Sequence, residues 1–196
     1  MKTQQLYGGI DVGSTTVKLV IMNDENETLF SRYERHFSDV KAASERIIKE
    51  AEAELGSDQA ISFTITGSGG IGLANLLKLK FIQEVIACTK TVETLIPQTD
   101  VSIELGGEDA KITFFGASLE QRMNGSCAGG TGAFIDQMAT LLKTDASGLN
   151  ELAKDYDTLY PIASRCGVFA KTDVQPLING WCTKRRYCGK HFSSRC

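Results

Sequence analysis

The feature that most constrains the fold is a pattern that occurs twice along the chain. Residues 7–37 and residues 100–125 each hold three short runs of alternating apolar and polar residues, separated by turn residues. This alternation predicts a three-stranded meander at both places. The remaining segments have helical spacing or turn composition. Helices are expected over 38–55, 73–79, 81–96, 132–142 and 147–156 and towards 179, with a strand over 60–66.

Two units of strands followed by helices predict two similar α/β subdomains that face a cleft, the usual place for a ligand in such folds. We expect the first subdomain over residues 1–97 and the second over 98–179. Of the 196 residues, 42% are hydrophobic and 23% charged, as in ordinary globular proteins. A net charge of −3 argues against a nucleic-acid partner. The absence of a signal peptide and of a long apolar run predicts a cytoplasmic protein without membrane spans.

The first meander contains the motif "GIDVGSTTVKLV". Asp11 lies at the expected end of a strand, and Gly13, Ser14 and Thr15 form a tight turn after it. Such a turn presents backbone amides to phosphate oxygens, and the nearby carboxylate can hold Mg²⁺, usually through water. Lys18 follows as either a phosphate contact or a surface residue. A plain hairpin with a glycine turn would explain the same residues.

The second meander repeats this device in "IELGGEDAKI". Glu104 ends a strand, Gly106 and Gly107 form the turn, and Glu108 and Asp109 follow. Two such units in like positions predict a clamp that holds a triphosphate and its metal from both sides. The alternative is a pair of solvated hairpins. A third glycine turn, "TGSGGIG" at residues 66–72, is a weaker signal that a strand-to-helix connection explains.

The six cysteines of a cytoplasmic chain point to metal or redox chemistry more than to disulfides. Cys127 lies in a glycine-rich loop that opens a helix, and Cys166 lies in a second small-residue turn. Two thiolates are too few for a cubane cluster, which needs four, but a two-fold dimer would supply them. Two buried, inert cysteines would fit the sequence as well. Cys88, within an apolar helix, is expected in the core, and His36 is expected to be structural.

Four segments together carry a resemblance. They are "GIDVGSTTVKLV", "IELGGEDAKITFF", "NGSCAGGTGAFIDQMA" and "SRCGVFAKTDVQPLIN". In this order they resemble the BadF/BadG/BcrA/BcrD-type ATPases, which activate 2-hydroxyacyl-CoA dehydratases and benzoyl-CoA reductases. The sequence around Glu104 and Cys127 is most similar to that of the N-terminal part of large fused acyl-CoA dehydratase activases. The resemblance extends over residues 6–179.

The resemblance implies the actin-like ATPase fold of the acetate and sugar kinase, Hsp70 and actin superfamily. It implies a homodimer with one [4Fe–4S] cluster at its interface, held by Cys127 and Cys166 of each subunit. The helix N-terminus beyond the thiol loop, with Gly129 and Gly130 before it, would stabilise the anionic cluster. ATP hydrolysis with Mg²⁺ would change the angle between the subdomains.

Low-potential electrons would then pass from a ferredoxin or flavodoxin to a dehydratase or reductase of anaerobic metabolism. Asp11 and Glu104 would be the catalytic acids. The remaining nucleotide contacts would be Gly13, Ser14, Thr15, Lys18, Gly106, Gly107 and Glu108.

Two departures from the family pattern leave alternatives open. Glu104 stands where the superfamily commonly has Asp, and the later adenosine motif is absent, so the second subdomain is expected to be incomplete and its apolar surface exposed. A small-molecule kinase of the same superfamily would need the phosphate turns but not the cysteines. A fragment without ATPase activity is the other alternative.

The last 17 residues, 180–196, differ in composition from the rest of the chain. They hold five Lys or Arg, no acid and three of the six cysteines. Written in codons and shifted by one base, this tail can encode the helix that the family pattern has at this position. We therefore expect a frameshift near Asn179 or Gly180 and a non-native tail. The alternative is a zinc site made of Cys182, Cys188, His191 and Cys196, whose spacing fits loosely.

Overall fold

The computed structural model describes residues 5–116, 118–124, 129–156, 158–163 and 166–179. The chain divides into two compact units, residues 1–99 and residues 100–196, which are described separately below. The sequence predicts this boundary at residue 97. The expected tail, with its alternative zinc ligands, lies outside the described residues, as does Cys127.

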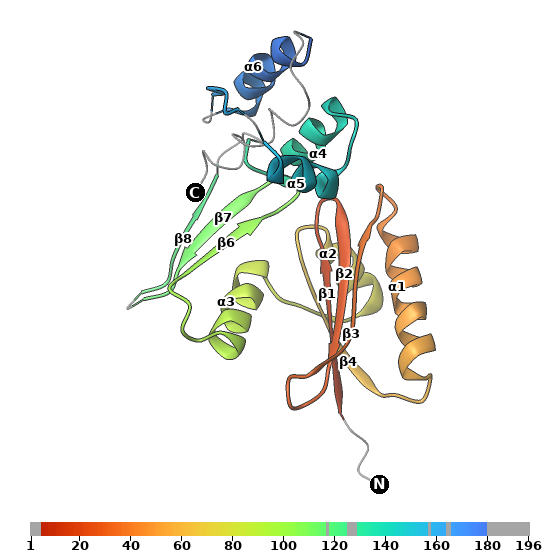
Figure 1. The fold of residues 1–196 in the computed structure, drawn as a ribbon. Helices are drawn as coiled ribbons and strands as arrows, with labels where there is room; N and C mark the ends of the chain where they lie inside the picture. Colours follow the sequence, from red (N-terminus) through yellow and green to blue (C-terminus); the bar gives the residue numbers. More distant parts are fainter. Residues whose placement is uncertain (1–4, 117, 125–128, 157, 164–165, 180–196) are drawn as a thin grey trace. The chain divides into compact units, whose positions relative to one another are not determined.

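The first unit is built on a five-stranded mixed sheet (Figure 1). Its strands are β1 (Leu6–Val12), β2 (Thr16–Met22), β3 (Thr28–Arg35), β4 (Ile61–Thr66) and β5 (Lys80–Phe81). The order across the sheet is β3-β2-β1-β4-β5. The first three strands form the predicted antiparallel meander, and β4 pairs in parallel with β1. The ends of β1 and β4 therefore lie side by side at one edge of the sheet.

Three helices belong to this unit, namely α1 (Val40–Leu55), α2 (Gly70–Leu77) and α3 (Glu84–Leu95). Helix α1 packs on β2 and β3, and α2 packs on β4 and β5. The central strands are buried on alternate residues, as period-two patterning requires. Ile10, Leu19 and Ile65 are among the fully buried side chains of this core. Burial of these residues supplies the main stabilising term for the unit.

Three local expectations are wrong. The sequence predicts Ser38 as the cap of α1, but Asp39 caps it, with its Oδ1 accepting the amide of Ala42 at 3.0 Å. Residues 81–83 are expected to be helical, but Phe81 pairs in the short strand β5 and α3 begins at Glu84. Cys88 is expected in the core, but it is half-buried on α3, where Val92 is the buried residue.

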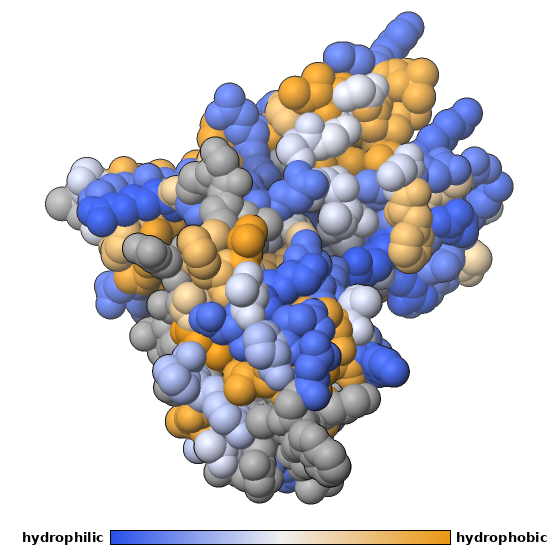
Figure 2. All heavy atoms as spheres, turned by 90° about the horizontal axis from the view of Figure 1, so that it is seen from above, coloured by the Kyte–Doolittle hydropathy of each residue, from blue (hydrophilic) through white to orange (hydrophobic). Residues whose placement is uncertain are grey.

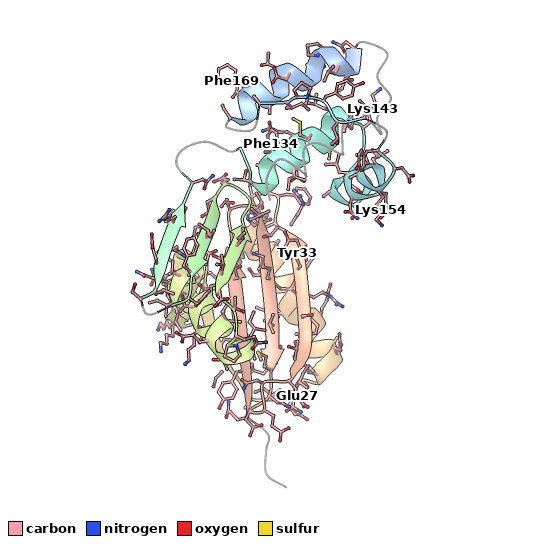
Figure 3. The ribbon with its side chains drawn as sticks, turned by 60° about the vertical axis from the view of Figure 1, so that its left-hand side comes forward. Glu27, Tyr33, Phe134, Lys143, Lys154 and Phe169 are labelled. Atoms are coloured by element: carbon pink, nitrogen blue, oxygen red, sulfur yellow. The ribbon has the colours of Figure 1, made fainter. Side chains whose placement is uncertain are left out.

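The second unit begins with the other predicted meander, a three-stranded antiparallel sheet in the order β6-β7-β8. Its strands are β6 (Val101–Leu105), β7 (Ala110–Phe114) and β8 (Glu120–Met123), followed by α4 (Gly132–Leu141), α5 (Ala146–Lys154) and α6 (Gly167–Asn179). The three helices share one apolar cluster. Phe134 of α4, marked in Figure 3, packs there with Leu149 of α5 and with Ala170 and Val174 of α6.

One face of the second sheet carries exposed apolar side chains. Val101, Ile103 and Leu105 alternate along β6, and Ile103 is 68% exposed. Figure 2 likewise shows apolar residues at the surface among charged ones. Adjacent exposed apolar residues of this kind are typical of a surface that another element covers. Within the described part of the chain, no helix combines the length and apolar character that a membrane span needs.

Two isoleucines that differ in burial allow a matched test of this arrangement. Ile65 is fully buried in β4, whereas Ile103 is exposed on β6. We expect Ile65→Ala to lower the free energy of unfolding by about 2–5 kcal/mol, because it leaves a cavity in the core. Ile103→Ala should change it by about 0.5 kcal/mol or less, as exposed substitutions do. Urea unfolding followed by circular dichroism measures both, and equal losses would contradict the described core.

Candidate functional site

The first glycine turn connects β1 to β2, and a charged pair flanks it. Asp11 near the end of β1 stands directly opposite Lys18 of β2, whose Nζ lies 2.6 Å from Asp11 Oδ2. The same ammonium lies 5.7 Å from the centre of the Tyr33 ring, an arrangement that attracts a cation to the ring face. The second carboxylate oxygen, Asp11 Oδ1, is buried and has no hydrogen-bond partner among the described residues.

The turn itself is fixed by backbone hydrogen bonds and by His36. The amide of Gly13 donates to the carbonyl of Thr16 at 2.9 Å, which closes the turn. The amide of His36 donates to the carbonyl of Thr15, and its Nε2 lies 3.2 Å from the carbonyl oxygen of Gly13. His36 is 7% exposed, and both its backbone and its ring contact the turn, which agrees with the expected structural role. Its contact with this glycine turn could not be seen from sequence spacing.

The weaker glycine motif at residues 66–72 lies beside this turn. Thr66 stands next to Asp11 in the parallel register of β1 and β4, and its Oγ1 is also buried without a partner among the described residues. Gly67 has a φ of +91°, and a Cβ there would collide with the carbonyl of Val12 and with Asp11 Oδ1. The amide of Gly69 donates to that carbonyl at 2.9 Å. Residue 67 must therefore be glycine, because its φ is positive and because no room exists for a Cβ.

The second glycine turn connects β6 to β7. Like the first turn, it is flanked by an acid and a lysine on opposite strands. Glu104 stands directly opposite Lys111, and Glu104 Oε2 is buried without a partner among the described residues. The amide of Gly106 donates to the carbonyl of Asp109 at 2.8 Å. Lys111 Nζ lies 3.3 Å from Asp109 Oδ2, and the lysine side chain is only 8% exposed. Lys111 was not expected at the site, although its spacing from Glu104 repeats that of Lys18 from Asp11.

The start of α4 is bonded to this second turn. The amides of Gly132 and Ala133 donate to the carbonyls of Gly106 and Gly107, both at 2.8 Å. Gly130 has a φ of +102°, and Thr131 after it is fully buried. The first two amides of α4 are therefore bonded to the turn and not available to an anion. A helix end still attracts negative charge through its dipole.

The glycine after Cys166 lies close to Gly129. Cys166 is half-buried immediately before α6, and its carbonyl accepts the amide of Ala170 at 2.9 Å. A Cβ on Gly167 would lie 3.3 Å from Gly129 Cα and 3.0 Å from the ring of Phe134. The backbone that follows Cys166 thus lies against the backbone two residues after Cys127. Within the described ranges, no three His, Cys, Asp or Glu residues gather as a metal site.

The expected site residues that the structure describes thus fall into two groups, one in each unit. Asp11, Gly13, Ser14, Thr15 and Lys18 belong to the first unit, and Glu104, Gly106, Gly107, Glu108, Gly129, Gly130 and Cys166 belong to the second. Ser14 and Glu108 are exposed at the tips of their turns. The clamp across the two units stays a prediction, as do the individual roles of these residues.

Comparison with known proteins gives a family match and close relatives. Residues 9–180 match the BadF/BadG/BcrA/BcrD ATPase family. The chain is 31% identical over 190 residues to the activator of lactoyl-CoA dehydratase from Anaerotignum propionicum, covering 94% of this chain and 73% of that protein. It is 30% identical over 171 residues to the 2-hydroxyisocaproyl-CoA dehydratase activator of Clostridioides difficile, covering 85% of this chain and 63% of that protein. The chain thus spans between about three fifths and three quarters of the length of these relatives.

Two solved structures share the fold. Component A of the (R)-2-hydroxyglutaryl-CoA dehydratase of Acidaminococcus fermentans matches with a TM-score of 0.81 at 28% identity, over 92% of this chain and 71% of that one. The activator of the 2-hydroxyisocaproyl-CoA dehydratase from Clostridium difficile, solved with bound ADPNP, matches with a TM-score of 0.82 at 26% identity, over 96% and 71%. The predicted α/β, actin-like ATPase fold is confirmed by these matches. Because the family match takes in most of the sequence, the chain belongs to the BadF/BadG/BcrA/BcrD ATPase family.

Proposed function

We propose that this chain carries the nucleotide-binding turns and the thiol ligands of an ATP-dependent activator of a 2-hydroxyacyl-CoA dehydratase. The observation that carries the proposal lies in the second unit, where one helix start joins both features. Helix α4 binds the Gly106–Gly107 turn through its first amides, and the loop before it contacts Gly167, next to Cys166. The proposed nucleotide turn and the proposed thiol segment would thus be joined at one helix end.

Three of the buried oxygens that have no partner among the described residues fit a magnesium nucleotide. Asp11 Oδ1, Thr66 Oγ1 and Glu104 Oε2 are carboxylate or hydroxyl oxygens, the ligands that Mg²⁺ and its bound waters prefer. Buried polar atoms without a partner call for a ligand, an ion or water. Asp11 would hold Mg²⁺ through water, and Glu104 would accept a hydrogen bond from the water that attacks the γ-phosphate. The relative solved with bound ADPNP supports nucleotide binding by this chain.

The thiols fit an iron–sulfur cluster only if two chains contribute. Cys127 and Cys166 give two ligands per chain, and a cubane cluster takes four. A two-fold homodimer that brings the two pairs together would complete the set. A [4Fe–4S] cluster there would supply low-potential electron transfer. The chain's own part is to hold the thiolates next to the start of α4, whose dipole stabilises their charge.

The partners follow from the chemistry of the relatives. Two of them are named as activators of lactoyl-CoA and 2-hydroxyisocaproyl-CoA dehydratases. We propose a dehydratase of this type, or a benzoyl-CoA reductase-like enzyme, as the electron acceptor. A ferredoxin or flavodoxin would be the donor, in the cytoplasm of an anaerobically growing cell.

The cluster can be tested by metal analysis after anaerobic reconstitution. We expect the wild-type chain to bind about four iron and about four sulfide ions per two chains. Cys166→Ala and Cys127→Ala should each abolish this binding, because each removes two of the four ligands of a dimer. Cys88→Ala is the matched control, since Cys88 lies half-buried on α3 in the other unit. A colourless wild-type protein that phosphorylates a metabolite would favour the kinase alternative.

Nucleotide binding can be tested by titration with Mg²⁺ and ATP in a calorimeter. Asp11→Asn should weaken binding of Mg²⁺-ATP at least about tenfold, because it removes the charge that holds the metal, equivalent to about 1.4 kcal/mol. It should affect ATP binding without Mg²⁺ much less. Asp24→Asn, an exposed acid in the β2–β3 turn, is the control and should bind like the wild type. Equal affinities of Asp11→Asn and wild type would contradict the proposed metal role.

A further inference from the structure

The two nucleotide hairpins share an element that the glycine motifs do not include. In the first, Asp11 precedes Lys18 by seven residues and stands opposite it across β1 and β2. In the second, Glu104 and Lys111 have the same separation and stand opposite each other across β6 and β7. Directly opposed residues on one face of an antiparallel pair have Cβ atoms about 5 Å apart. Each turn is therefore flanked by an acid and a lysine at equivalent positions.

The two lysines make different contacts. Lys18 pairs with the acid opposite it at 2.6 Å, and its side chain is 37% exposed. Lys111 instead lies 3.3 Å from Asp109, within the turn, and its side chain is 8% exposed. Glu104 Oε2, across the strand pair from Lys111, keeps no hydrogen-bond partner among the described residues. The second hairpin thus places a buried cation beside Asp109 and directly across the strand pair from Glu104.

A buried lysine is a costly way to stabilise a hairpin. Removing an ammonium from water is unfavourable unless it is paired, and an apolar residue of similar size commonly stabilises as well or better. A purely structural need at this position of β7 would be met by an apolar residue such as the neighbouring Ile112. The charge therefore points to a role towards the acids of the turn.

We propose that Lys111 is a positioning residue of the second nucleotide turn. Its ammonium holds Asp109 at the turn and offsets the repulsion between the Asp109 and Glu104 carboxylates. Glu104 then keeps an oxygen available for the water that attacks ATP. This inference rests on the proposed function, since it gives Lys111 a task in ATP hydrolysis. In this proposal Lys111 acts through Asp109 and Glu104, so it is a positioning residue and not a catalytic one.

The test compares ATP hydrolysis by the full chain with two substitutions at Lys111. We expect Lys111→Met to lower kcat at least about tenfold while KM for Mg²⁺-ATP changes less than about threefold, because the proposal gives this lysine a task in hydrolysis and none in binding the phosphates. Lys111→Arg keeps the charge and should stay within about threefold of the wild-type kcat. Lys154→Met is the matched control. Lys154 is an exposed lysine of α5, marked in Figure 3, and pairs with Glu151 at 2.7 Å.

Several outcomes would overturn the inference. A kcat of Lys111→Met within about twofold of the wild-type value would do so. An equal fall in kcat in Lys111→Met and Lys111→Arg, in proportion to the fall in their melting temperatures, would also do so. If Lys111→Met does not fold, Asp109→Asn replaces it as the test variant. The side chain of Asp109 is half-exposed, so the chain should still fold when this charge is removed. Asp109→Asn should also lower kcat, and a wild-type rate would reject the role of the pair. A wild-type chain that hydrolyses no ATP would reject the proposed function and this inference together, whereas an active wild type with unaffected variants would reject only the inference.

Discussion

Two hydrogen bonds join the second glycine turn to the start of helix α4. The amides of Gly132 and Ala133 at the start of α4 donate to the carbonyls of Gly106 and Gly107 in the β6–β7 turn. The first amides of a helix have no partner within it, and the carbonyls of a tight turn need donors, so each group satisfies the other. This contact fixes the turn relative to the helix, and the loop before the helix in turn contacts Gly167. Glycine at these positions lets backbone approach backbone closely.

In the first unit the glycine turn is also fixed by hydrogen bonds from other segments, but through different residues. His36 donates from Nε2 to the carbonyl of Gly13, while the amide of Gly69 in the next turn donates to the carbonyl of Val12. In both units a segment distant in sequence bonds to the turn, and an acid beside the turn has a buried oxygen with no partner in the described part of the chain. A braced backbone with an unsatisfied acid is suited to a charged ligand, because the groups that meet it need little rearrangement on binding.

The two units differ in how completely their sheets are buried. The five strands of the first unit are packed by α1 and α2 around a core that includes Ile10, Leu19 and Ile65. In the second unit the apolar cluster lies among the three helices, and β6 presents Val101, Ile103 and Leu105 at the surface. Three strands with an uncovered apolar face are close to the lower limit of an independently stable sheet. The second unit is thus expected to be the less stable of the two.

The sequence by itself determined the elements and the motifs. Period-two alternation identified both meanders, and the acid–glycine motifs located both turns, because these signals depend only on neighbouring residues. Local errors arose where residues compete for the same role. Ser38 and Asp39 both suit a helix cap, and residues 81–83 carry too weak a pattern to show that Phe81 pairs with β4.

Only the tertiary structure decided how the motifs meet. It placed Thr66 beside Asp11, bonded the start of α4 to the Gly106–Gly107 turn, and turned Lys111 towards Asp109. It also brought the segment after Cys166 against Gly129. These contacts join residues far apart in the chain, and they depend on strand register, burial and close approach of backbones. Such quantities are set by the whole packed unit and leave no local pattern in the sequence.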